Sequence, residues 1–190
     1  MRQDFNHITE DRLSELFPVI LEPHNPVWLE QYILERGHLI SIFGDKIIRI
    51  NHIGSTSVNG LIAKPTIDIL LEVSNDTDID IFTERMKEEG YVINTPQSDI
   101  IMYLKGYTPQ GFEGQCIHIH VRYYGEWDEL YFRDYLLEHP EVAEEYGDLK
   151  TRLKNQFTNN RDGYTEAKTD FVREYSEIAR KEFPRRYQVD

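Results

Sequence analysis

The sequence predicts an α+β fold, in which a mixed β-sheet has helices packed on one side and is followed by a C-terminal helical segment. Three observations indicate this fold. Short apolar runs with strand-like spacing gather between residues 47 and 124, one helical pattern interrupts them, and helical spacing continues from Asp128 almost to the C-terminus. Strands followed by a run of helices are typical of α+β proteins.

The N-terminal part of the chain predicts two helices. Residues 1–18 are polar and compatible with a helix, and we interpret them as an N-terminal helical extension of a single domain over residues 19–190. Asn25 followed by Pro26 predicts the start of a second helix. Apolar residues then recur at helical spacing until Gly44, where a glycine predicts the end of that helix.

The middle of the chain predicts the sheet and one helix, and the C-terminal part predicts three more helices. The helix in the middle covers residues 76–90 and ends at a glycine. Beyond Asp128, breaks at Pro140 and at residues 159–162 divide the chain into three helices. In the last predicted strand, polar and apolar side chains alternate and should occupy opposite faces. Five segments have the β-branched and apolar pattern of strands, at residues 47–53, 66–73, 91–93, 100–104 and 116–124.

The charge balance restricts the partners of this protein. The chain has 21 Lys and Arg against 34 Asp and Glu, a formal net charge of −13. Such a surface repels polyanions, so we expect no non-specific binding to nucleic acid. A nucleotide or a phosphorylated small molecule is still compatible, because a few local cations or one metal ion override the global field.

The expected location is the cytoplasm, without a membrane partner. No apolar run approaches the length of a membrane span, and the N-terminal residues lack the apolar region of a signal peptide. The single cysteine, Cys116, excludes an internal disulfide. Disulfide-free chains are typical of reducing compartments.

The turn formed by Gly54-Ser55-Thr56-Ser57 is the first candidate site. Glycine permits close approach of a ligand, and successive N–H groups together with serine hydroxyls can hold a phosphate. The alternative is an ordinary turn, because glycine and serine are common in turns. The candidates for phosphate or nucleotide binding are Gly54, Ser55, Ser57, Lys64, Arg122, Arg133 and Lys150.

Asp68 is the second candidate, as a catalytic residue and metal ligand. It interrupts the strongest strand pattern, where a carboxylate is costly to bury unless it is paired, hydrogen-bonded or bound to a metal. Glu72 lies on the same face but about 13 Å away, too far to share one metal ion comfortably. The alternative is a structural salt bridge from Asp68 to Lys64 or Arg49.

His118 and His120 form the third candidate. Two imidazoles at positions i and i+2 of a strand can face one ion, and with Asp68 they would form a two-histidine, one-carboxylate set. The predicted cofactor is a divalent metal, either Mg²⁺ or, if the histidines are ligands, Zn²⁺ or Mn²⁺. The alternative is a pair of ordinary polar residues beside the sheet. We expect Ser55, Asp68 and both histidines to converge on one cleft.

These motifs occur together in a pattern that resembles the GrpB family, a branch of the nucleotidyltransferase superfamily. The resemblance covers roughly residues 19 to 180, and its most specific part is HIGSTSVNGLIAKPTIDILLEV, from His52 to Val73. It implies a nucleotidyltransferase-like scaffold in which Gly54 and Ser55 hold a triphosphate and Asp68 holds Mg²⁺. The weaker matching stretches are Pro23–Trp28, His118–Val121, FRDYL with His139-Pro140, Tyr146–Lys150 and Tyr164–Lys168.

One position departs from the superfamily pattern. A second carboxylate is expected two residues after the first, and Leu70 stands there. Two-metal transfer requires clustered oxygen ligands. Three functions therefore stay open: metal-assisted transfer of a nucleotidyl group from an NTP to a small acceptor, non-catalytic binding of a nucleotide or phosphorylated metabolite, and metal-dependent hydrolysis through Asp68, His118 and His120.

Overall fold

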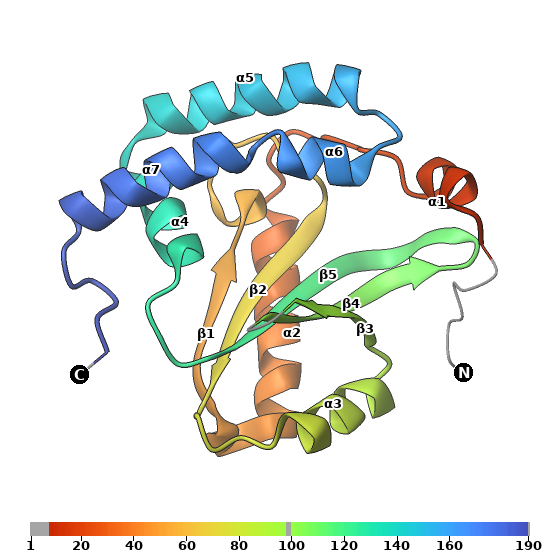
Figure 1. The fold of residues 1–190 in the computed structure, drawn as a ribbon, viewed down its shortest axis with the longest axis vertical. Coiled ribbons are helices and arrows are strands. Elements are labelled where there is room, and N and C mark those ends of the chain that lie inside the picture. The colour runs from red at the N-terminus through yellow and green to blue at the C-terminus, as the bar shows by residue number, and fades with distance from the viewer. Residues whose placement is uncertain (1–7, 98–99, 190) are drawn as a thin grey trace.

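The computed structural model describes residues 8–97 and 100–189, which contain a five-stranded sheet in the order β1-β2-β5-β4-β3 (Figure 1). The predicted fold class is confirmed. The strands are β1 (Ile47–Ile53), β2 (Thr66–Val73), β3 (Val92–Gln97), β4 (Ile100–Thr108) and β5 (Gly111–Tyr123). The α-helices are α1 (Glu10–Leu16), α2 (Val27–Phe43), α3 (Ile79–Glu88), α4 (Asp128–Glu138), α5 (Pro140–Gln156), α6 (Arg161–Glu166) and α7 (Thr169–Glu182).

The sheet is mixed because β2 runs parallel to β5, whereas the other three pairs of neighbouring strands are antiparallel. The parallel register places Asp68 beside His118 and Leu70 beside His120. On the other side of β2, Ile53 at the end of β1 lies opposite Asp68. The turn that follows β1 therefore begins next to Asp68.

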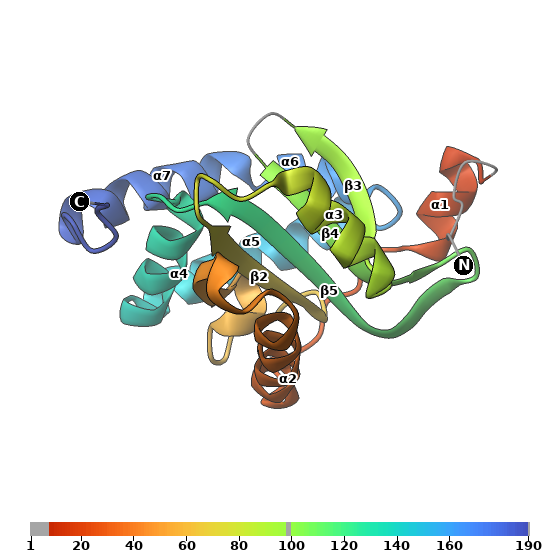
Figure 2. The same cartoon turned by 90° about the horizontal axis from the view of Figure 1, so that it is seen from below.

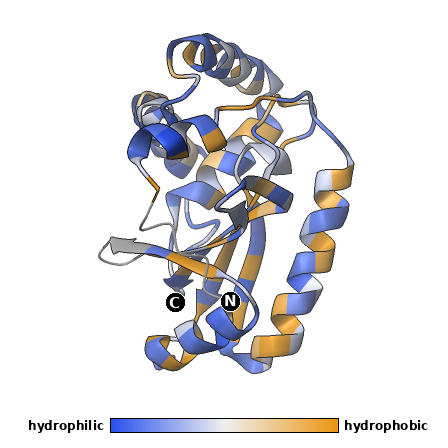
Figure 3. Cartoon of the chain, turned by 90° about the vertical axis from the view of Figure 1, so that its right-hand side faces the viewer, coloured by the Kyte–Doolittle hydropathy of each residue, from blue (hydrophilic) through white to orange (hydrophobic). Residues whose placement is uncertain are grey.

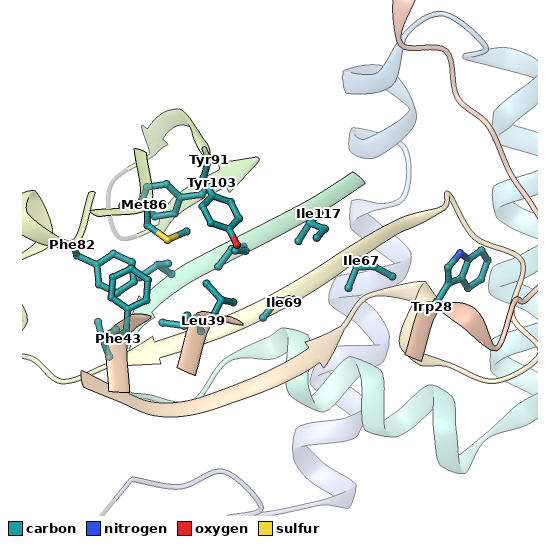
Figure 4. Close-up of a cluster of buried hydrophobic side chains, with 14 of the residues drawn as sticks. Trp28, Leu39, Phe43, Ile67, Ile69, Phe82, Met86, Tyr91, Tyr103 and Ile117 are labelled. Atoms are coloured by element: carbon teal, nitrogen blue, oxygen red, sulfur yellow. The ribbon is translucent and has the colours of Figure 1, made fainter. Parts of the chain in front are cut away.

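One face of the sheet is apolar and is covered by α2 and α3 (Figures 1 and 2). Ile67 and Ile69 of β2 and Ile117 of β5 are buried on this face against Leu39 of α2 (Figure 4). Each such side chain contributes about 1.5–3 kcal/mol through burial. Because side chains alternate along a strand, the polar residues of β2 and β5 occupy the opposite face.

The C-terminal helices form a separate layer on the polar side of the sheet (Figure 1). Helix α4 also touches the sheet, where Leu130 packs against Ile53 and Leu70. The apolar cluster of this layer joins α4, α5, α7 and the loop between β1 and β2, and its buried members include Val58, Leu61, Tyr131, Phe132, Leu136, Val142 and Ala179.

Several boundaries differ from the sequence prediction: β3 and β4 are longer than expected, α3 is shorter, and two further differences have a clear structural reason. The last predicted helix is divided into α6 and α7, because the N–H of Lys168 bonds to the carbonyl of Thr165, only three residues back. Strand β5 begins at Gly111 rather than at residue 116. The reason is a tight hairpin with β4, closed by a hydrogen bond from the Thr108 hydroxyl to the Gly111 carbonyl (2.9 Å).

Helix α1 packs against the β4–β5 hairpin. Leu13 and Phe17 contact Tyr107 and Cys116, and the rings of Phe17 and Tyr107 are 5.3 Å apart. The assignment of residues 1–18 as a separate extension stays a prediction.

Helix α2 carries apolar residues on several sides rather than along one stripe (Figure 3). Trp28 and Leu39 are buried, whereas Leu29, Ile33 and Leu34 are more than half exposed. Among the residues that the structure describes, no helix combines the length and the apolarity required to cross a membrane.

Candidate active site

A pocket of about 520 Å³ lies between the polar face of the sheet and the C-terminal helices, a size that suits a small-molecule ligand. The expected convergence of the turn, Asp68 and the two histidines on one cleft is confirmed, whereas their chemical roles stay predictions. The lining residues that the sequence predicted are Gly54, Ser55, Lys64, Asp68, His118, His120 and Lys150.

Asp68, His118 and His120 form a compact group of metal-ligand type on the floor of the pocket. Asp68 Oδ1 lies 3.2 Å from His118 Nδ1 and 3.6 Å from His120 Nε2. Each residue offers one ligand atom, and these three atoms all lie within 4.8 Å of one another. Ligands at about 2.0–2.2 Å from a metal ion lie about 2.8–3.6 Å from their neighbours, so both measured distances suit a shared ion.

The hydrogen bonding of His120 also fits a metal site. Its Nε2 atom is buried and has no hydrogen-bond partner among the described residues. A buried polar atom without a partner carries a desolvation cost that a bound ion would remove. The three residues present therefore fit a divalent cation.

The electrostatics of the pair Asp68 and His118 favour the forms that bind metals. Burial opposes ionisation of Asp68, but its interactions with His118 and His120 hold its pKa well below the usual range. Burial lowers the pKa of His118, although Asp68 opposes that shift. At neutral pH the cluster is thus a carboxylate beside a neutral imidazole, as metal ligation requires.

Tyr107 and Arg161 orient His118 through the ring nitrogen that does not face Asp68. The Tyr107 hydroxyl lies 2.7 Å from His118 Nε2, and Arg161 Nη2 donates a hydrogen bond to the same hydroxyl at 3.1 Å. Burial raises the pKa of Tyr107 to about 12, so its proton is retained at neutral pH. Groups that bond the second ring nitrogen of a histidine fix its orientation and tautomer, which strengthens ligation by the first.

The turn after β1 is shaped for close contact with Asp68. Gly54 has φ 69°, a conformation that L side chains rarely adopt. A Cβ atom at Gly54 would lie 2.5 Å from Asp68 Oδ2. Buried Thr56 anchors the turn by donating a hydrogen bond to the Thr66 carbonyl (3.1 Å). Glycine is required at position 54 because of both its backbone conformation and the closeness of the Asp68 carboxylate.

Gly54→Ala is expected to lower both stability and metal affinity. The backbone at Gly54, with φ 69° and ψ −176°, lies in a region nearly restricted to glycine and costs alanine about 1–3 kcal/mol, and the new methyl group must displace the Asp68 carboxylate. Gly60→Ala is the matched control, because Gly60 has φ 79° but nothing within 4 Å of its added Cβ. Both variants should melt earlier, and titration with Mn²⁺ should show weaker binding for Gly54→Ala alone. Equal Mn²⁺ affinity in the two variants would contradict this account.

Lys150 of α5 reaches the turn from the helical layer. Its Nζ atom lies 3.0 Å from Ser55 Oγ and also donates to the Ile62 carbonyl. The residue is 2% exposed, and its amino group lies 4.7 Å from the centre of the Tyr146 ring. Burial, with the nearby cationic residue Lys168, lowers the pKa of Lys150 to about 6.

Two further lysines and one arginine complete a cationic wall. Burial lowers the pKa of Lys64 to about 8 and that of Lys168 to about 7. Both amino groups lie over the ring of Tyr164, at 5.5 and 4.3 Å from its centre. In the described part of the chain, no carboxylate is within salt-bridge distance of Lys64, Lys150 or Lys168. These side chains, with Arg161, are placed to receive an anion.

Three predicted phosphate ligands lie outside the pocket lining, which corrects the sequence prediction. The Ser57 hydroxyl donates to the Gly54 carbonyl at 2.6 Å and closes the turn instead. Arg122 pairs with Glu129 and stacks on Trp127, so its charge is already neutralised.

Arg133 was predicted to line the cleft with Lys150 and does not. Its guanidinium donates to the Asn51 side chain (3.2 Å) and to the His52 carbonyl (3.0 Å), and pairs with Asp134. It joins α4 to β1. Helix α4 does touch the sheet, as the prediction required. The Arg133 side chain, however, is directed toward β1 and not into the pocket.

The alternative partners considered for Asp68 are also resolved. Arg49 pairs with Glu72 through two of its nitrogens, and Glu72 is fully buried. A salt bridge from Asp68 to Arg49 is therefore wrong. Lys64 lines the same pocket as Asp68 without forming an ion pair with it in the described structure.

Sequence reasoning assigned no role to Arg161, Lys168 or Tyr107, which complete the pocket. Lys168 falls in the stretch Tyr164–Lys168 that carried the family resemblance, and this was the available signal. Arg161 stands in the polar cluster that predicted a helix break. Tyr107 had no local signal, because only the β4–β5 pairing brings it to His118.

Comparison with known proteins gives a consistent result. The GrpB protein family matches residues 18–177. The glutamate-rich protein GrpB of Alkalihalophilus pseudofirmus is 35% identical over 162 residues, which cover 82% of this chain and 92% of that protein. The UPF0157 protein YqkA of Bacillus subtilis is 35% identical over 161 residues, 83% of this chain, but the chain spans only 46% of YqkA's length.

A solved structure agrees with the sequence matches. The crystal structure of the conserved protein GrpB from Enterococcus faecalis superposes with a TM-score of 0.76 at 29% identity, covering 86% of this chain and 99% of that chain. Sequence and fold thus point to the same group of proteins. The chain belongs to the GrpB family.

Proposed function

We propose that this protein transfers a nucleotidyl group from an NTP to a small acceptor with the help of one divalent metal ion. The observation that carries the proposal is the content of a single pocket. It combines the cluster of Asp68, His118 and His120 with the lysine and arginine side chains of the cationic wall. A metal complex of a polyphosphate needs both features, and the resemblance to nucleotidyltransferases supplies the reaction class by analogy.

Asp68, His118 and His120 would hold the metal ion. Two imidazoles and one carboxylate suit Zn²⁺ or Mn²⁺ better than Mg²⁺, which prefers oxygen ligands. When bound, the ion would act as a Lewis acid at a phosphoryl oxygen. Tyr107 holds His118 in place through the 2.7 Å contact with Nε2.

The cationic wall would bind the phosphates. Lys64, Lys168 and Arg161 line one pocket in a chain of net charge −13, so the local field opposes the global one. The backbone of the Gly54 turn passes within contact distance of Asp68. A phosphate held by the turn would therefore adjoin the metal cluster.

A second candidate is non-catalytic binding of the same ligand. It is favoured by Leu70, which is fully buried against Leu130 at the place where a second carboxylate is usual. Without that carboxylate the pocket offers a single metal position of the expected kind. Binding would need no more than this, whereas transfer also needs a group that activates the attacking hydroxyl.

Metal and nucleotide are expected to stabilise the chain together more than either does alone. A ligand at 100 times its Kd raises the free energy of unfolding by about 2.7 kcal/mol. Thermal melting with Zn²⁺, Mn²⁺ or Mg²⁺, each with and without a non-hydrolysable NTP analogue, measures this directly. His120→Ala should remove the metal-dependent part of the shift.

Turnover assays then separate the candidate functions. Multiple turnovers of pyrophosphate release only when a small acceptor is added indicate transfer. Continuous release of nucleoside monophosphate without an acceptor indicates hydrolysis, and stabilisation without turnover indicates binding. A melting midpoint unchanged by every metal and analogue would exclude the proposal.

A further inference from the structure

In a direct two-metal transfer a second metal ion helps to activate the attacking hydroxyl, and the second carboxylate that would hold this ion is missing. Leu70 occupies the position of the second carboxylate and is buried against Leu130. Of the two other carboxylates that line the pocket, Glu129 is held by Arg122, and Asp162 lies on α6 outside the metal-type cluster. The pocket therefore needs another way to activate a nucleophile.

Ser55 and Lys150 have the geometry of a nucleophile and its base. Ser55 Oγ lies 3.0 Å from Lys150 Nζ, and both residues line the pocket. Ser55 directly follows Gly54, whose backbone lies against the Asp68 carboxylate. Ser55 thus lines the pocket that contains the metal cluster, one residue beyond the glycine that contacts Asp68.

The surroundings of Lys150 favour a neutral amine. Burial of its amino group, together with the like charges of Lys168 and Lys64, disfavours the ammonium form and outweighs the hydrogen bond to the Ile62 carbonyl and the contact with the Tyr146 ring. The resulting pKa of about 6 leaves most Lys150 side chains unprotonated at neutral pH. As an ammonium group, Lys150 donates a hydrogen bond to Ser55 Oγ. As a neutral amine at the same position, it can accept the proton of the Ser55 hydroxyl.

We propose that Ser55 is a nucleophile that carries the nucleotidyl group in a covalent intermediate, with Lys150 as its general base. This inference rests on the proposed function. In the first step the Ser55 hydroxyl proton moves to Lys150 Nζ, a bond forms between Oγ and the α-phosphorus of the NTP, and the bond from that phosphorus to the β-phosphate oxygen breaks. Pyrophosphate leaves with the bonding electron pair.

The second step returns the enzyme to its starting state. An acceptor hydroxyl attacks the same phosphorus and releases its proton to solvent, the bond from Oγ to phosphorus breaks, and the proton on Lys150 returns to Ser55 Oγ. Two displacements retain the configuration at phosphorus, whereas a single direct transfer inverts it. The first step also proceeds without an acceptor, so the intermediate can be sought although the acceptor is unidentified.

The experiment is intact-mass spectrometry of the full chain incubated with ATP, GTP, CTP or UTP and with MnCl₂ or ZnCl₂. The wild type should gain the mass of one nucleotidyl group per chain, which is a nucleoside monophosphate less one water, and peptide mapping should place it on Ser55. Ser55→Ala should show no adduct. Lys150→Met should form it about 10²–10⁴-fold more slowly, the range expected for loss of a general base.

Ser41→Ala is the control, because the Ser41 hydroxyl donates to the His38 carbonyl within α2, outside the pocket lining, and this variant should keep the adduct. Circular dichroism and calorimetry with a non-hydrolysable NTP analogue show whether each variant folds and binds. A wild type that binds metal and analogue but forms no adduct, or an adduct that persists in Ser55→Ala, overturns the Ser55 intermediate and leaves the proposed function standing. A wild type that binds neither metal nor analogue overturns both.

Discussion

Asp68→Asn is expected to reduce metal-dependent nucleotide turnover to background. Asparagine is nearly isosteric with aspartate but neutral, so His118 and His120 lose the only carboxylate within their cluster. Loss of a residue that only orients a metal ligand lowers metal affinity about 10–100-fold. Loss of a ligand itself should lower the affinity for Mn²⁺ or Zn²⁺ by more than this. Metal titration by calorimetry and turnover assays on the same preparation measure both effects.

The matched control for this substitution is Asp162→Asn. Asp162 lines the same pocket from α6 but lies outside the metal-type cluster, so its variant should keep metal affinity. A purely structural Asp68 would behave differently. Its substitution would cost about 1–3 kcal/mol of stability and leave affinity unchanged, and a variant that melts early yet binds metal and nucleotide like the wild type would rule out the catalytic role.

Lys168→Met is expected to stabilise the empty protein and to weaken anion binding. In the empty pocket Lys168 repels Lys64 and Lys150, and burial further disfavours its charge. A charged hydrogen bond to phosphate contributes about 1.5–3 kcal/mol, so tripolyphosphate affinity should fall about 10–100-fold. Thermal melting and calorimetry with tripolyphosphate measure the two opposite effects. The control is Lys181→Met, which removes an exposed charge at the far end of α7.

The pH dependence of both quantities follows from the lowered pKa of Lys168, about 7 in the folded chain. The unfolded value is about 10.4, so between these pH values the unfolded state binds more protons and the stability of the empty wild type rises with pH. The gain in stability from Lys168→Met is therefore full below pH 7 and disappears as the pH approaches 10. Tripolyphosphate affinity of the wild type should fall as the pH rises above about 7, because binding requires protonated Lys168 and Lys64. Equal affinity at pH 6 and pH 9 would contradict the proposed anion site.

Local patterns in the sequence were sufficient for most of the fold. The alternation in β2 and β5 placed Asp68 and His118 on the faces opposite their isoleucine neighbours, and the structure agrees. Gly44 and Gly90 ended helices where predicted. Such signals are reliable because alternation and helix termination depend on residues a few positions apart.

The composition of the pocket depended on contacts that no local pattern contains. Ser55 and Lys150 are 95 residues apart and meet only because α5 folds back over the sheet. Arg122 shares a strand face with His120, yet its pairing with Glu129 removes its charge from the pocket.

The sequence by itself therefore determined the strands, the helices and the candidate ligands at Asp68, His118 and His120. Only the tertiary structure decided which cations join them. The parallel register of β2 and β5 sets Asp68 beside His118, and the burial of Leu70 by α4 excludes a second carboxylate position. The physical reason is that strand register and helix docking follow from burying apolar surface over the whole chain, whereas the facing of a side chain follows from its own backbone.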